Sequence, residues 1–277
     1  MPTDTLAEKT FDTGELTINY ATGPGPGSGR AVVLLHGMTA DWLGFRDLMA
    51  QLSGSWRSYA CDLRGHGKSG RGSGYHLPDY ERDVVSFLEK VTGPAVLVGH
   101  SLGALTGLLC AAHRPELALG LILLDPPVYV RNSPVQIHSG VADWFGWVYE
   151  TMKASPTFDQ VVKACRLREP DTDESALRTM AVRVSRVDPG AVGAALRNEM
   201  GDGTDMEIAL KSLRCPTLIL RGEWSNGGCV RDEDAAWMQT TLPSLHVVQI
   251  PGGSHGFLWE NPDVTWHMIQ DFLLALS

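Results

Sequence analysis

The sequence lacks paired cysteines, a long apolar run and a basic cluster, and each absence argues against a class of protein. Its five cysteines are an odd number without paired spacing, which argues against a disulfide framework and against a zinc site. No stretch approaches the length of a membrane span. The N-terminus, MPTDTLAEKT, has acidic and polar residues where a signal peptide needs a basic start and an apolar stretch. We therefore expect a cytoplasmic protein with no membrane partner.

Positive charge is also scarce. The 277 residues carry a formal net charge of −9, and no Lys/Arg cluster offers the electrostatic surface that a nucleic-acid binder needs. Nucleic acids are therefore not expected as partners. With 43% hydrophobic and 20% charged residues, the composition is ordinary for a soluble globular protein, and the length suits one large domain or one domain with an insertion.

What the sequence does contain is an alternation of short apolar runs and helix-like segments. The runs occupy 31–37, 94–101 and 118–127, with weaker ones at 58–63 and 246–252, and the helix-like segments occupy 77–91, 101–113, 231–242 and 261–276. Continuous apolar runs suit strands that are buried on both faces. The alternation predicts an α/β fold with a mostly parallel central sheet flanked by helices. The part before the glycine-rich loop 23–29 reads more like an antiparallel hairpin at the sheet edge.

The alternation stops after residue 127 and resumes near residue 214. Between them, helix starts are expected at Ser155-Pro156, from Asp171 to Glu174 and at Asp188-Pro189, because each place offers a polar N-cap or a first-turn proline. We predict that 1–127 and 214–277 form the core domain and that 128–213 form an inserted, all-helical cap.

The segment Gly99-His100-Ser101-Leu102-Gly103 carries the chemistry. It matches the pattern G-x-S-x-G, follows the apolar AVLV and opens the helix-like LGALTGLLCAA. In this context the serine sits on a sharp turn from strand to helix, where the two glycines relieve crowding and leave the hydroxyl exposed. The helix N-terminus stabilises negative charge that develops there. We predict that Ser101 is a nucleophile; the alternative is a tight turn whose serine only caps the helix.

With this motif, the sequence resembles the α/β-hydrolase family over nearly its whole length outside the cap. LLHG at 34–37, DLRGHGKS at 62–69 and GGSHGFLWENPDV at 252–264 add to the resemblance. In such proteins, the residue after the HG pair and the residue after the nucleophile donate backbone N–H groups to the oxyanion. The resemblance implies that Met38 and Leu102 form the oxyanion hole, and fixed donors of this kind typically contribute a few kcal/mol to acyl transfer.

His255 is the predicted general base. It lies in a glycine-rich loop after the last apolar run, flanked by Gly252, Gly253 and Gly256, so its ring can reach across the tops of the strands. The other histidines do not recur at the spacing of three or four residues that suggests a metal site. Neither a metal nor an organic cofactor is expected.

The acid that should orient His255 has an unusual position. The family usually places it after the strand formed here by TLILR, and the expected slot falls at or near Ser225. A serine cannot hold an imidazolium as a carboxylate does. Two neighbours could take the role: Glu223, displaced into the slot, and Asp232, from the start of the next helix.

Asp125 is the third candidate for the acid. It ends the apolar run 118–127, and catalytic groups in open α/β sheets collect at the C-terminal ends of strands. Some members of the family, including certain lipases and dehalogenases, take their acid from this position. We favour Asp125, which keeps the order Ser101, Asp125, His255. The alternative is that Asp125 only caps the turn before Pro126.

The expected reaction is hydrolysis of a hydrophobic carboxylic ester or a lactone through an acyl-enzyme intermediate. Aromatic residues above a catalytic pocket suggest an apolar or aromatic small-molecule substrate, and the expected substrate-binding residues are Trp144, Trp147, Trp224 and Tyr129. The alternative is that Trp144 and Trp147 only join the cap to the core. C–C bond hydrolases or lyases on the same scaffold, and ligand receptors with a slow triad, stay open as functions. The sequence also leaves open whether the chain forms a homodimer.

Overall fold

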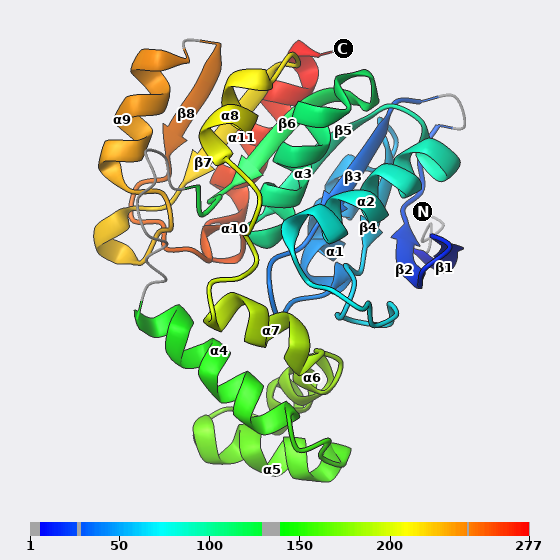
Figure 1. The fold of residues 1–277 in the computed structure, drawn as a ribbon, viewed down its shortest axis with the longest axis vertical. Coiled ribbons are helices and arrows are strands. Elements are labelled where there is room, and N and C mark those ends of the chain that lie inside the picture. Colours follow the sequence, from blue (N-terminus) through cyan, green and yellow to red (C-terminus); the bar gives the residue numbers. More distant parts are fainter. Residues whose placement is uncertain (1–5, 27–28, 129–138, 243, 277) are drawn as a thin grey trace.

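The computed structural model describes residues 6–26, 29–128, 139–242 and 244–276, and a mostly parallel sheet forms its centre. The eight strands lie in the order β1-β2-β4-β3-β5-β6-β7-β8 (Figure 1). Neighbours are parallel from β4 to β8, whereas β2 is antiparallel to both β1 and β4. The predicted fold class and the predicted edge hairpin are therefore confirmed. The strands are β1 (Ala7–Asp12), β2 (Thr17–Thr22), β3 (Ala31–Leu35), β4 (Arg57–Cys61), β5 (Ala95–His100), β6 (Ala118–Leu124), β7 (Thr217–Arg221) and β8 (Leu245–Gln249).

Helices cover both faces of this sheet, which explains why the central strands are apolar without alternation. In β3, Val33 belongs to one hydrophobic core and its neighbour Leu34 to the other, and both side chains are fully buried. The first core is closed by α2 (Leu77–Phe87), α3 (Leu102–His113), α8 (Met206–Ser212) and α9 (Asp232–Thr241). The second is closed by α1 (Arg46–Leu52), α10 (Phe257–Glu260) and α11 (Pro262–Ala275).

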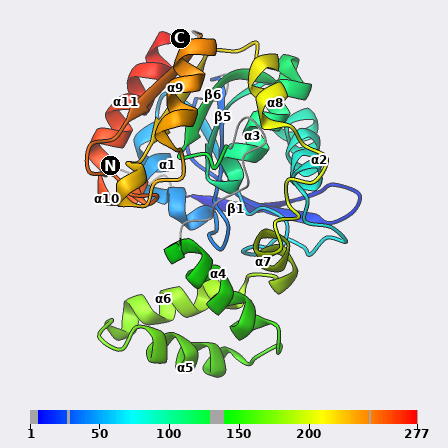
Figure 2. The ribbon, with the colours of Figure 1, turned by 60° about the vertical axis from the view of Figure 1, so that its left-hand side comes forward.

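Four further helices form a separate layer at the C-terminal ends of the strands (Figures 1 and 2). They are α4 (Ser139–Met152), α5 (Phe158–Arg168), α6 (Glu174–Ser185) and α7 (Pro189–Leu196). Asp173 and Asp188 cap the N-termini of α6 and α7, as their sequence predicts. The helix α8, which the sequence analysis placed in the cap, instead packs against α3 of the sheet layer. The division at residues 128 and 213 stays a prediction.

The described helices are also relevant to the predicted compartment. None of those within the described ranges is long and apolar enough to cross a membrane. The cytoplasmic location stays a prediction from the N-terminal sequence.

Candidate active site

Ser101 occupies a strained turn between β5 and α3. Its φ of 51° and ψ of −113° are rare for an L-residue, and such conformations typically cost about 1–3 kcal/mol. Gly99 and Gly103 make the turn sterically feasible, because a Cβ atom at either position would collide with backbone atoms, at Gly99 those of Gly103 and at Gly103 those of Leu35. The Ser101 N–H donates to the carbonyl of Leu124 over 3.0 Å, which fixes the turn to the end of β6.

Asp125 comes directly after β6 and is fully buried. Its N–H donates to the carbonyl of Leu220 over 2.7 Å, so β6 and β7 stay paired up to the site. Oδ2 of Asp125 lies 2.7 Å from Nδ1 of His255. The carboxylate also accepts the N–H of Gly222 on Oδ1 over 3.0 Å and that of Cys229 on Oδ2 over 2.7 Å. These donors hold both carboxylate oxygens in place.

The two other candidate acids are engaged elsewhere. Oε1 of Glu223 accepts the N–H of Gly252 over 2.8 Å. Oδ1 of Asp232 pairs with Nη1 of Arg221 over 2.6 Å. Among the residues that the structure describes, neither carboxylate forms a hydrogen bond with the ring of His255. Asp125 is therefore the candidate that the fold brings to the histidine, and its catalytic role stays a prediction.

His255 is also held through its backbone and its ring face. Nε2 of His100 lies 2.9 Å from the carbonyl oxygen of His255, and the two rings stack with centroids 4.6 Å apart. Burial lowers the pKa of His100 to about 3, so its neutral ring can donate Nε2–H to that carbonyl. For His255, burial also acts to lower the pKa, but the hydrogen bond to Asp125 and the neighbouring Cys229 outweigh it and raise the pKa to about 10.

The two predicted oxyanion donors lie in the same cavity as Ser101. Leu102 is the first residue of α3, so its N–H has no partner within the helix. Met38 follows β3 in a turn that continues through Thr39, whose φ is 64°. In the described ranges, neither N–H donates to a protein acceptor. Both amides are thus available to a ligand oxygen beside Ser101, and their role stays a prediction.

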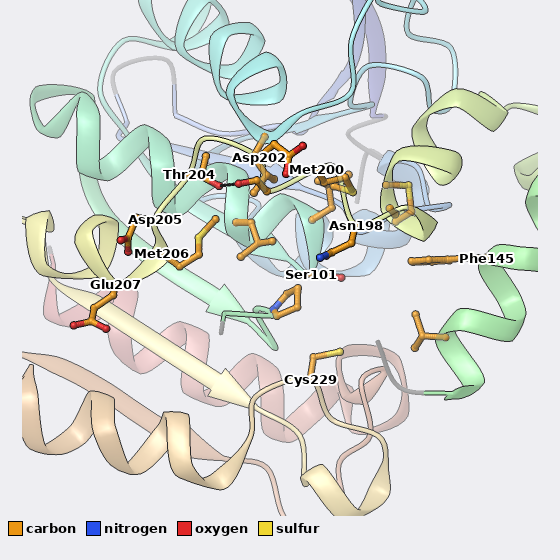
Figure 3. Close-up of a pocket in the computed structure, with 18 of the residues that line it drawn as sticks. Ser101, Phe145, Asn198, Met200, Asp202, Thr204, Asp205, Met206, Glu207 and Cys229 are labelled. Atoms are coloured by element: carbon orange, nitrogen blue, oxygen red, sulfur yellow. Dashed lines mark hydrogen bonds between the residues drawn. The ribbon is translucent and has the colours of Figure 1, made fainter. Parts of the chain in front are cut away.

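A cavity of about 590 Å³ opens over Ser101 and His255 (Figure 3). This volume lies within the range of typical small-molecule sites, roughly 300–1,000 Å³. Its apolar wall comes from α2, α3, α4, α8 and the segment between α7 and α8, and includes Leu77, Leu105, Phe145, Met200 and Met206. Besides His255, the charged residues on its lining are Asp202, Asp205, Glu207 and Lys211. Within the described part of the chain, no hydrogen bond joins the Ser101 hydroxyl to the His255 ring, although apo sites often tighten only when substrate binds.

The tryptophans predicted to bind substrate in the cap do not line this cavity in the described structure. Nε1 of Trp144 donates to Oγ1 of Thr39 over 2.8 Å, and the rings of Trp144 and Trp147 are 5.2 Å apart. The guanidinium of Arg168 lies over both rings. Phe145, one position further along α4, does line the cavity, because successive helical residues point about 100° apart.

The other two predicted substrate contacts have different outcomes. Trp224 belongs to the short 3₁₀ helix Trp224–Asn226 after β7 and is absent from the described lining of the cavity. Tyr129 lies outside the described residues.

Two residues at the site were missed in the sequence analysis. Cys229 lines the cavity, and its Sγ lies within 4.8 Å of an Asp125 oxygen and a His255 ring nitrogen. The sequence offered one signal for Cys229, which is that it lies shortly after the vacant acid slot near Ser225. These three residues could supply metal ligands, but the Asp125 oxygens already accept protein hydrogen bonds, so we assign no metal. Asn198 also lines the cavity, and nothing in its sequence context indicates this.

The fold agrees with the comparison to known families. Residues 32–267 match the family described as "Alpha/beta hydrolase family". The chain belongs to this family. It is 29% identical over 280 residues to 2-(acetamidomethylene)succinate hydrolase of Mesorhizobium japonicum, covering 98% of this chain and 97% of the relative. It is 28% identical over 257 residues to pimeloyl-[acyl-carrier protein] methyl ester esterase of Xanthomonas campestris, covering 90% and 97%.

A solved structure shows the same likeness in three dimensions. The crystal structure of E-2-(acetamidomethylene)succinate hydrolase aligns with a TM-score of 0.73 and 26% identity, covering 97% of this chain and 99% of that one. The chain is thus an α/β hydrolase with hydrolase and esterase relatives.

Proposed function

We propose that this protein is a serine hydrolase that cleaves a hydrophobic carboxylic ester or lactone through an acyl-enzyme intermediate. The observation that carries the proposal is the 2.7 Å contact between Asp125 Oδ2 and His255 Nδ1, in a cavity that also contains Ser101 and two available amides. A buried acid, a histidine and an elbow serine, converging from different elements, are the components of nucleophilic acyl transfer.

In the proposed mechanism, His255 removes the proton of Ser101 as its Oγ attacks the substrate carbonyl. The C–O π electrons move to the carbonyl oxygen, where the N–H groups of Met38 and Leu102 stabilise the charge. Collapse of this intermediate expels the alcohol, which takes the proton from His255. Water then attacks the acyl-enzyme by the same route and releases the acid. Asp125 orients the ring and stabilises its positive charge throughout.

The lining of the cavity supports an uncharged substrate. Besides His255, which pairs with Asp125, its described charged residues are three carboxylates and one cation, Lys211, which pairs with Glu207 over 2.6 Å. Such a lining repels an anionic substrate. The Mesorhizobium relative is named for a succinate, which carries two carboxylates, so we propose a different substrate for this chain. The apolar wall around Phe145 and Met206 favours a hydrophobic acyl group instead.

Turnover of uncharged aryl esters and lactones by the parent protein and by Ser101→Ala tests the proposal. We expect the parent to hydrolyse at least one of them with a burst of alcohol release, and Ser101→Ala to lose the burst. Hydrolysis that persists in Ser101→Ala would contradict the proposed nucleophile. A parent protein without turnover on the whole panel would favour a C–C bond hydrolase, a lyase or a receptor.

A further inference from the structure

Asn198 adopts a backbone conformation that usually belongs to glycine. Its φ is 58°, in the left-handed region. It lies in the C-terminal cap of α7. Its N–H donates to the carbonyl of Ala195 over 3.0 Å, and the N–H of Glu199 donates to the carbonyl of Ala194 over 2.9 Å. This is a Schellman arrangement, in which glycine is the commonest residue at the left-handed position. The helix cap explains the left-handed backbone of Asn198, but it does not require an amide side chain at this position.

The segment around Asn198 is fixed to the start of α2. The ring Nδ1 of His76 lies 2.8 Å from the carbonyl oxygen of Glu199, and the N–H of Leu77 donates to the carbonyl of Met200 over 2.8 Å. Nε of Arg197 donates to Oε1 of Glu199 over 2.8 Å. These hydrogen bonds hold the backbone of Asn198 in place. Less conformational entropy is therefore lost when its side chain binds a ligand.

The Asn198 side chain is directed into the catalytic cavity. Figure 3 shows its amide pointing toward Ser101, from the side of the cavity opposite Cys229. No hydrogen bond joins this amide to another of the described residues. A carboxamide offers two N–H donors and one acceptor, so its capacity to recognise a polar group is unused by the protein.

We propose that Asn198 determines specificity by binding an amide group on the acyl part of the substrate. This inference rests on the proposed function, which makes Ser101 the nucleophile and His255 the acid that protonates the leaving alcohol. The leaving group must therefore lie on the side of His255 and Cys229, whose reactive atoms are neighbours. The acyl group extends to the opposite side, where Asn198 can both donate to and accept from an amide. The apolar wall contacts the rest of the acyl chain.

The first test compares two esters of equal shape, 4-nitrophenyl adipamate, which ends in a carboxamide, and 4-nitrophenyl 6-methylheptanoate. The variant is Asn198→Gly, because glycine preserves the left-handed backbone and removes the amide. We expect the ratio of kcat/KM for the amide ester to that for the apolar ester to fall roughly three- to tenfold, the value of one hydrogen bond. Leu196→Ala, a change at the exposed last residue of α7, is the control and should leave the ratio unchanged. An unchanged ratio in Asn198→Gly, with the fold intact by thermal melting, overturns the inference.

The second test separates this inference from the proposed function. Calorimetric titration of both esters into Ser101→Ala and into Ser101→Ala/Asn198→Gly measures binding without turnover. We expect the amide ester to bind Ser101→Ala more tightly than its isostere, and the added glycine to remove that preference. If the parent protein fails to hydrolyse either ester while this preference holds, the proposed reaction is wrong and the binding role of Asn198 stands. If Ser101→Ala shows no preference, the binding role is wrong whatever the reaction.

Discussion

Asp125 and His255 are 130 residues apart in the sequence, yet Oδ2 of one lies 2.7 Å from Nδ1 of the other. The contact depends on β6, which ends at Leu124, and on the loop after β8. Both elements end at the same edge of the sheet because their strands are parallel. The acid that we propose for this hydrolase, Asp125, therefore lies one strand earlier than the slot around Ser225 where the family usually has it.

Replacing Asp125 by Asn should lower kcat by about three to four orders of magnitude while the protein still folds. The amide cannot stabilise the imidazolium that forms when Ser101 attacks. Steady-state kinetics with an aryl ester, alongside a thermal melt, checks this. The matched control is the double variant Glu223→Gln/Asp232→Asn, which should keep its activity. Loss of activity in the double variant with normal turnover in Asp125→Asn would move the acid back to the later strand.

The activity should rise with pH well above neutrality. Burial acts to lower the pKa of His255, but Asp125 and Cys229 raise it to about 10 from its ordinary 6.5, and only the neutral ring can accept the proton of Ser101. The pH profile of kcat/KM measures the midpoint, and Cys229→Ala should shift it to lower pH. A parent profile that is already flat at neutral pH would show that the ring titrates normally.

The same shift makes a prediction about stability. Because the folded state binds the proton of His255 more tightly than the unfolded chain, the pair with Asp125 stabilises the fold fully below about pH 6.5. This contribution should be lost as the pH rises toward about 10. Thermal melts of the parent and of His255→Gln across this range should converge at alkaline pH. A difference in melting temperature that does not change with pH would contradict the linkage.

Gly103→Ala should destabilise the protein, by about 1–3 kcal/mol or more, because overpacking in a tight core forces the backbone to move. A Cβ atom there would collide with the carbonyl of Leu35. Gly146→Ala in α4 is the control, since a Cβ at Gly146 would meet no atom within 4 Å. The control should raise stability by about 0.5–1 kcal/mol, because alanine favours helices over glycine. Denaturant unfolding measures both, and equal effects would show that Gly103 is not constrained by packing.

The buried pair of Arg64 and Asp83 should matter far more than a surface pair. Arg64 is fully buried, and its Nε and Nη2 donate to the two oxygens of Asp83 over 2.7 and 2.8 Å. Asp83→Ala removes the buried partner and leaves only the exposed Glu15 beside the guanidinium, so it should cost about 3–5 kcal/mol. Glu89→Ala, which removes an exposed partner of Arg114, should cost at most about 1 kcal/mol. Chemical denaturation of both variants checks the contrast, and similar losses would contradict it.

Local patterns in the sequence were enough to predict the sheet and the sharp turn at Ser101. The apolar run 118–127 became β6 because a strand buried on both faces needs no polar positions. The strand, the glycines and the helix around Ser101 all lie within a few residues, so their geometry follows from local sequence. The vacant slot near Ser225 was likewise visible, and it directed attention to Asp125.

The lining of the cavity could not be predicted in this way, because it depends on how helices pack. Trp144 and Phe145 are neighbours in the sequence, but the helical rotation between them sends only Phe145 to the cavity. Asn198 faces the cavity over Ser101 because α7 ends at Leu196 and the following residues bind to the start of α2. Such long-range contacts leave no periodic pattern in the sequence.

Mass spectrometry of the acyl-enzyme tests the central claim most directly. The protein is mixed with a 4-nitrophenyl ester, quenched in acid during the burst, digested and analysed for peptides that have gained the acyl mass. The proposed mechanism predicts the added mass on the peptide that contains Ser101, and no such peptide from Ser101→Ala. Acylation found instead at Cys229, whose thiol lies in the same cavity, or turnover without any acylated peptide in the burst, would contradict Ser101 as the nucleophile.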